Sequence, residues 1–142
     1  MIEVHAQQPI AVVNIDLDER AFVFPAGKSL LQLKVVAFES GLSFEGVFAF
    51  NNGKAQHHLF KLNVEDAVDF SRKLVDGVYR AQSGHLLSDY VMVSLNVVAN
   101  GYVFQIGDMT DPKEIYIGTG SIWRVCKGLL QALDHVRPKQ SN

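Results

Sequence analysis

The histidines and acidic residues of this sequence are its first candidates for chemistry, because such side chains most often bind metals or move protons. His57 and His58 are adjacent, and neighbouring side chains of a strand point to opposite faces, so the two imidazoles cannot easily chelate one ion. Asp108, Asp111 and Glu114 lie close together but lack the spacing of a calcium-binding loop. We therefore expect neither a metal site nor a cofactor.

Nucleophiles and phosphate-binding loops are the next candidates. Cys126 is the only cysteine and lies within an apolar helical pattern, which favours a buried structural thiol over a nucleophile. The segment Gly118-Thr119-Gly120-Ser121 could present helix N–H groups to a phosphate, but it lacks the spacing of known phosphate loops, so we interpret it as a turn with an N-cap. No catalytic residue is predicted, and an enzyme with a dispersed site stays open as an alternative.

The length and charge of the chain narrow the classes of function. Its 142 residues match the size of one domain, and 13 basic against 15 acidic residues leave a formal net charge of −2, so no global field draws it to nucleic acid or to an anionic membrane. No stretch is apolar for long enough to span a membrane, and residues 1–25 show no basic segment followed by a long apolar one. We expect a cytoplasmic protein without a membrane partner.

Apolar and polar residues alternate in the first half of the chain, as expected for strands with one buried face. Asn51-Asn52-Gly53 predicts a hairpin turn between two of these strands. A helix capped by Asn63 follows, with apolar residues at helical spacing to about residue 82. The predicted strands are 13–17, 21–24, 31–35, 44–50 and 58–62.

The second half follows the same plan, with strands predicted at 91–99, 102–106 and 115–117 and a helix over 122–136. Asn100-Gly101 predicts a hairpin between the first two strands. Because hairpin-length loops leave no room for parallel crossovers, the fold class is α+β, with a mainly antiparallel sheet and two helices. The chain 1–142 is predicted to be one domain, with two similar strand-strand-strand-helix halves at about 28–82 and 88–136.

The two halves share a repeated unit. Segments 60–78 and 115–133 align without a gap, at an offset of 55 (115 minus 60), and almost every apolar position of the first faces an apolar position of the second. The Asn-Gly pairs are out of step, because Asn52-Gly53 precedes the strand before the helix whereas Asn100-Gly101 lies one strand earlier. Whether the halves arose by duplication stays open.

The alternation also predicts a polar face of the sheet. If Leu31, Leu33, Val35 and their counterparts face the helices, the polar side chains between them share the opposite face. Such a face suits a ligand platform or a subunit interface. The binding residues predicted on it are Lys34, His57, Lys61, Asn96, Gln105 and Tyr116.

Trp123 is the remaining candidate recognition residue. With Arg124 and Lys127 beside it, it would form an aromatic and basic patch if it were exposed. It aligns with the apolar Val68 of the other half, and tryptophan fills cores effectively, so we predict that it packs in the core.

Antiparallel strands followed by a helix, twice in one short chain, give a plan that resembles the Whirly and Pur-alpha families of single-stranded nucleic-acid-binding proteins. The resemblance covers most of the chain without a diagnostic motif. It implies a sheet surface with basic and aromatic residues that binds phosphates and stacks bases, and helices that aid self-association. The residues that carry it are the strand 91–99, the hairpin Asn100-Gly101-Tyr102-Val103-Phe104, the strand 115–117 and the helix 122–136, with a looser counterpart in 31–82.

The function predicted first is a non-enzymatic binding or assembly module. It would act through the exposed sheet face on a protein partner or on a second copy of itself, as a homo-oligomer. The alternative is a single-stranded nucleic-acid-binding protein that uses Lys34, His57, Lys61 and Tyr116. An enzyme with a dispersed site is the third possibility.

Overall fold

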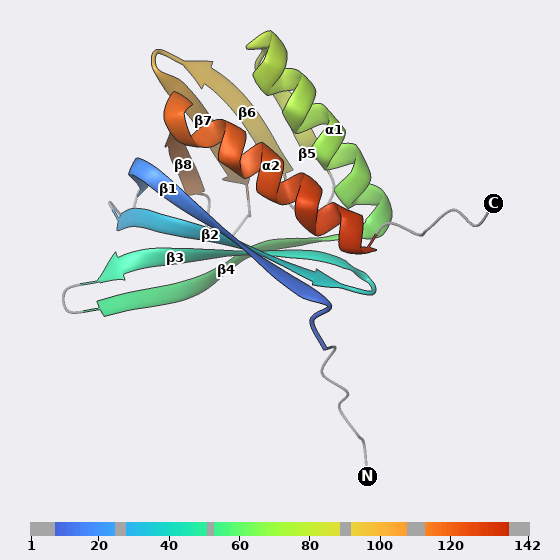
Figure 1. Ribbon diagram of the computed structural model, residues 1–142. Coiled ribbons are helices and arrows are strands. Elements are labelled where there is room, and N and C mark those ends of the chain that lie inside the picture. Colours follow the sequence, from blue (N-terminus) through green and yellow to red (C-terminus); the bar gives the residue numbers. More distant parts are fainter. Residues whose placement is uncertain (1–7, 25–27, 51–52, 89–91, 108–112, 137–142) are drawn as a thin grey trace.

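The computed structural model describes residues 8–24, 28–50, 53–88, 92–107 and 113–136. Two four-stranded halves each end in a helix (Figure 1). The first half consists of β1 (Ala11–Phe24), β2 (Lys28–Phe38), β3 (Gly41–Phe50), β4 (Gly53–Asn63) and α1 (Val64–Arg80). The second consists of β5 (Gly84–Ser88), β6 (Met92–Val98), β7 (Gly101–Gly107), β8 (Lys113–Gly118) and α2 (Thr119–Val136).

All eight strands form one antiparallel sheet in the order β4-β3-β2-β1-β8-β7-β6-β5. Within each half, neighbouring strands are consecutive in the chain, and the halves join where the end of β1 pairs with β8. Figure 1 shows both helices on the same side of this twisted sheet. The predicted α+β class, with an antiparallel sheet and two helices, is confirmed.

The sequence predicted five strands before the first helix and three before the second, whereas the structure has four before each. In the first half, the segments 13–17 and 21–24 belong to a single strand, β1, whose pairing with β2 shifts register between Asp16 and Ala21. In the second half, β5 was missed, because five residues are too few for alternation to show. Asn100-Gly101 joins β6 to β7, as predicted. Gly53 opens β4, and Asn51 and Asn52 of the other predicted turn lie outside the described residues.

A β-bulge in β2 corrects the predicted alternation. Leu31 was expected to face the helices, but it is exposed, and Leu30 is buried in its place. The pairing of β2 with β3 shifts register between Leu30 and Gln32. The extra residue turns Leu31 out of the core, while Leu33 and Val35 are buried as predicted.

Helix α1 begins and ends with well-formed caps. The Asn63 side chain accepts a hydrogen bond from the Asp66 N–H (2.8 Å), as the sequence predicted. At the other end Ala81 is left-handed (φ 52°), and its N–H bonds to the carbonyls of Gly77 and Val78. These contacts satisfy backbone groups that would otherwise lack partners at the two ends of the helix.

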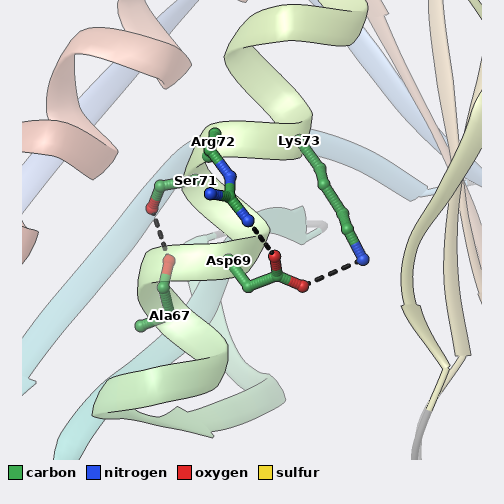
Figure 2. A network of polar contacts seen from close by, with 5 residues as sticks. All are labelled: Ala67, Asp69, Ser71, Arg72 and Lys73. Atoms are coloured by element: carbon green, nitrogen blue, oxygen red, sulfur yellow. Dashed lines mark hydrogen bonds and ion pairs between the residues drawn. The ribbon is translucent and has the colours of Figure 1, made fainter.

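The solvent side of α1 carries several ion pairs. Asp69 bridges Arg72 and Lys73, at 2.9 Å each (Figure 2), and Arg80 pairs with Asp76 at 2.9 Å. The hydrogen bond from Lys73, and then the one from Arg72, lower the pKa of Asp69. On the buried side, the Ser71 hydroxyl donates to the Ala67 carbonyl at 2.7 Å.

Each helix packs across the boundary between the halves. Helix α2 belongs to the second half but lies mainly on β1 and β2 of the first, while α1 contacts β5 as well as β3 and β4. Gly128 permits the closest approach, because a Cβ there would lie 2.5 Å from two side-chain atoms of Ile15. One core therefore includes both helices and strands of both halves.

The predictions made for α2 have different outcomes. The helix was expected at 122–136 after a turn at 118–121, but it begins at Thr119, so residues 119–121 form its first turn. Cys126 is buried, as predicted, and burial raises the pKa of its thiol to about 11. Trp123 was expected in the core, but half of its surface is exposed (50%). Ile122, Val125 and Leu129 form the buried stripe of this helix. Trp123 directly follows Ile122 in the helix, so its side chain is rotated away from that stripe.

Neither helix in the described part of the chain has the length and apolarity that a transmembrane helix requires.

Candidate functional site

The face of β1–β4 that points away from the helices contains the candidate site, and is here called the outward face. Its central row crosses four strands, with Asn14 beside Lys34, Lys34 beside Glu45, and Glu45 beside His58. The opposite, inner face packs on α1, where the Phe44 and Phe60 rings stack at 4.5 Å. The ring of Phe70, from α1, lies 5.7 Å from each of them.

A β-bulge in β4 decides which histidine lies on the outward face. The pairing of β3 with β4 changes register between Phe44 and Glu45, so Leu59 is an extra residue between Phe60 and His58. An inserted residue moves every side chain on one side of it to the other face. His58 therefore joins the outward face.

His57, the predicted binding residue, is on the wrong face for that role. It lies opposite Gly46, and its ring is 5.6 Å from the ring of Phe48, a buried inner-face residue. Regular alternation from Lys61 would have placed His57 outward, and the bulge reverses this. The prediction for Lys61 is unaffected, because Lys61 follows the bulge and lies opposite Ser43 on the outward face.

His58 is held by two side chains of β3. Its Nδ1 lies 2.6 Å from Glu45 Oε2 and 3.3 Å from Ser43 Oγ. A carboxylate accepts, so Nδ1 carries the proton that it donates to Glu45, and in the neutral ring Nε2 is left as an acceptor. Because Ser43 and Glu45 meet the same nitrogen, the three residues do not form a nucleophile-base-acid relay, in which the hydroxyl and the acid occupy different ring nitrogens.

A hollow of about 480 Å³ adjoins this cluster. Ser40, Ser43, His58 and Lys61 contribute its polar side chains, and Ser43 is almost fully buried (9% exposed). Phe38 and Leu42 contribute apolar surface. The hollow therefore places a lysine, a histidine and two serine hydroxyl groups beside an apolar wall.

A second hollow, of about 540 Å³, lies on the same strands and includes Lys34 and Lys54. In its lining, Gln32 Nε2 donates to Asp16 Oδ1 at 2.7 Å. Asp16 is thus engaged by Gln32, just as Glu45 is engaged by His58.

The lysines of the outward face are not neutralised in this way. Within the described part of the chain, Lys34, Lys54 and Lys61 make no hydrogen bond or ion pair. Their ammonium groups are thus available to a partner, while the two acids, Asp16 and Glu45, already have polar contacts.

The remaining predicted residues lie together on the second half. Asn96, Val103 and Tyr116 form one row across β6, β7 and β8, and Gln105 lies in the next row, between Ser94 and Glu114. This group is separate from Lys34 and Lys61, which lie on the first half.

The Tyr116 side chain, from β8, contacts the turn between β6 and β7. Its hydroxyl donates to the Asn100 carbonyl at 2.9 Å, and its ring covers Gly101, where a Cβ would come within 2.7 Å of the ring. The ring is therefore poorly placed to stack on a base.

Between the described strands and helices, the interior cavity is apolar. A cavity of about 40 Å³, between the sheet and both helices, is lined only by apolar side chains, among them Phe44, Leu74, Phe104 and Leu129. Across residues 8–136, leaving out the gaps given above, no three His, Cys, Asp or Glu side chains are grouped as a metal site requires.

Comparison with family models, with curated proteins and with solved structures finds no match for this chain. The resemblance to the Whirly and Pur-alpha plan accordingly stays a prediction.

Proposed function

We propose that this chain is a non-enzymatic binding module whose outward face receives a segment of another polypeptide. The observation that carries the proposal is an exposed apolar strip beside the hollow of Ser43, His58 and Lys61. Ile10 and Val12 are about half exposed (51% and 48%), and Val12 lies opposite Val36 in the sheet. Exposed apolar surface bordered by polar side chains marks interaction sites.

The mixture of groups on this face is typical of a protein interface. The apolar strip offers burial of hydrophobic area, and the lysines without partners offer charged contacts at its border. Strand β4 is also the edge of the sheet, so its outer backbone groups can pair with an extended chain. A polypeptide can use all three features at once.

Charge favours a different protein over a second copy of this chain at the β4 edge. Two β4 strands paired antiparallel about residues 57 and 58 would bring Lys54 of one copy opposite Lys61 of the other. Like charges directly opposite each other destabilise a strand pair. A segment that carries acidic side chains would meet the same lysines with opposite charge, so we propose an acidic segment.

A displayed library of random peptides tests the proposal without knowledge of the natural partner. Peptides are selected on the wild-type chain and then compared on Val12→Asp and on Leu130→Asp. Leu130 is an exposed apolar residue of α2 (41%), so its variant is the matched control. We expect Val12→Asp to weaken the selected peptides about tenfold or more, a difference of about 1.4 kcal/mol.

The control variant should bind these peptides as the wild type does, and circular dichroism should show that both variants fold. Selected peptides that bind Val12→Asp unchanged would contradict the proposal, as would a library that yields no binder. Sedimentation across a wide concentration range measures self-association. An oligomer that Val12→Asp abolishes would show that the partner of the outward face is a second copy of this chain, not another polypeptide.

Lys34, Lys54 and Lys61 on one face support a second candidate, the binding of single-stranded nucleic acid. Phosphate contacts release counterions, so this candidate predicts binding to labelled oligothymidine that weakens steeply with salt. We expect Lys34→Glu with Lys61→Glu to abolish such binding. The matched control, Lys73→Glu with Lys127→Glu, makes the same charge change on the helices and should retain it. An oligonucleotide that shows no salt-dependent binding would eliminate this candidate.

A further inference from the structure

We infer that the hollow bounded by Ser43, His58 and Lys61 is an oxyanion site, which holds a carboxylate or phosphate group and binds it more tightly when His58 is protonated. The inference rests on the proposed function, because the oxyanion would belong to the acidic segment bound on the outward face. The inference extends the proposed function by naming the chemical group that binds in this hollow.

The donors of this site converge from two paired strands. Lys61 lies directly opposite Ser43, and Ser43 Oγ lies 3.3 Å from His58 Nδ1. All three side chains line the same hollow of about 480 Å³. Since Nδ1–H is directed at Glu45, the Ser43 hydroxyl proton and the Lys61 ammonium group remain to donate to a bound oxyanion.

His58 supplies the dependence on pH. In the neutral ring Nε2 is an acceptor, which repels an oxyanion, whereas the protonated ring presents a second N–H and a positive charge. Imidazole is the side chain whose charge ordinarily changes between about pH 5 and about pH 8. Affinity for an anion should therefore rise when the ring gains its second proton.

The charged groups around His58 do not reverse the expected rise of anion affinity on protonation. From β3, Glu45 contacts the ring at 2.6 Å; from β2, Lys34 lies opposite Glu45; and Lys61 is on β4 itself. With neutral His58, the two lysines exceed the one carboxylate by a single charge. Protonation raises the excess to two.

The second hollow on the outward face, of about 540 Å³, serves as a control for this inference. It contains Lys34 and Lys54 but no histidine, and Asp16 is part of its lining. An ion attracted only by surface lysines would bind both hollows alike and without the pH dependence of imidazole.

The test is a titration of the isotope-labelled full chain with acetate and, separately, with sulfate, followed by the amide resonances of Ser43, His58 and Lys61. Both ions keep their charge between about pH 6 and about pH 8, so a change of affinity in this range reports on the protein. We expect saturable shifts at these three residues, with affinity several-fold higher at the lower pH.

Variants separate the roles of the side chains. Lys61→Gln should weaken binding at both pH values, and His58→Gln should remove the pH dependence while leaving weak binding. Lys54→Gln, in the other hollow, is the matched control and should change neither. Shifts that do not saturate, or that are equal in both hollows, would indicate an adventitious ion only. A pH dependence that persists in His58→Gln would also overturn the inference.

The peptides selected on the outward face then identify the source of the oxyanion. Each is compared with versions in which one acidic residue is replaced by glutamine or by phosphoserine. The oxyanion site would be supported if the glutamine peptide loses binding, the phosphoserine peptide keeps it, and Lys61→Gln removes this difference between the two. Peptides that lose binding on Val12→Asp but not on Lys61→Gln would refute the oxyanion site and leave the proposed function standing. Oligothymidine that binds through Lys61, where acidic peptides do not bind, would refute the assignment to a polypeptide.

Discussion

At the scale of single residues, Cys126 shows how burial determines reactivity. Its side chain is 3% exposed, and desolvation raises the pKa of the thiol to about 11. The thiolate is the reactive form, so we predict that a disulfide reagent modifies Cys126 only after denaturant unfolds the chain. Reaction of native Cys126 at the rate of a free thiol would contradict this prediction. The variant Cys126→Ala, which has no thiol, is the negative control.

The raised pKa of Cys126 also makes the stability of the protein depend on pH, with stability falling as the pH rises. The folded-state pKa lies above that of an unfolded thiol, about 8.5, so as the pH rises the unfolded chain loses this proton first. The contribution of Cys126 to the free energy of unfolding is complete below about pH 8.5 and falls towards pH 11, by at most about 1.4 kcal/mol per pH unit. The difference between wild type and Cys126→Ala should follow this course.

Individual site residues were predictable only where the strands alternate regularly. Lys34 and Lys61 lie on the outward face as the sequence indicated, because no bulge separates them from their buried neighbours Val35 and Leu62. His57 was assigned to the wrong face because of the extra residue Leu59 in β4. No glycine marks this bulge, so the sequence offered no signal that would have selected His58, Ser43 and Glu45 instead.

At the scale of elements, the strongest predictions concerned the helices. The helix starts, Val64 and Thr119, are 55 residues apart (119 minus 64), which is the offset at which the sequence segments align. Each helix follows directly on a strand, and the Asn63 cap was recognisable because asparagine at this position satisfies a backbone N–H of the first turn. Strand β5 was not predictable, because only its pairing with β6 makes its five residues a strand.

At the scale of the whole molecule, the outward face exists because the helices cover the other side of the sheet. Periodicity predicts that a helix packs on a sheet, but it does not say on which half. The structure places α2 over β1 and β2, so the second half covers the strands that carry the candidate site. This arrangement depends on contacts between residues far apart in the chain, which local sequence patterns do not specify.

The contact of Gly128 with Ile15 provides a test of this interlocked arrangement. A methyl group at residue 128 would lie 2.5 Å from Ile15 Cδ1 and Cγ1, and overpacking of this kind costs about 1–3 kcal/mol. Alanine is the better helix former by about 1 kcal/mol. We therefore predict that Gly128→Ala destabilises the wild type by about 1 kcal/mol but stabilises an Ile15→Ala background, where the space is open.

Hydrogen exchange extends this prediction to the whole molecule. Because α2 joins the two halves through one core, Gly128→Ala should reduce amide protection in β3 and in β7 by the same free energy, and denaturant unfolding should remain a single transition. Loss of protection confined to one half would show that the halves unfold independently. A destabilisation that persists unchanged in the Ile15→Ala background would show that the contact between α2 and β1 is not the cause.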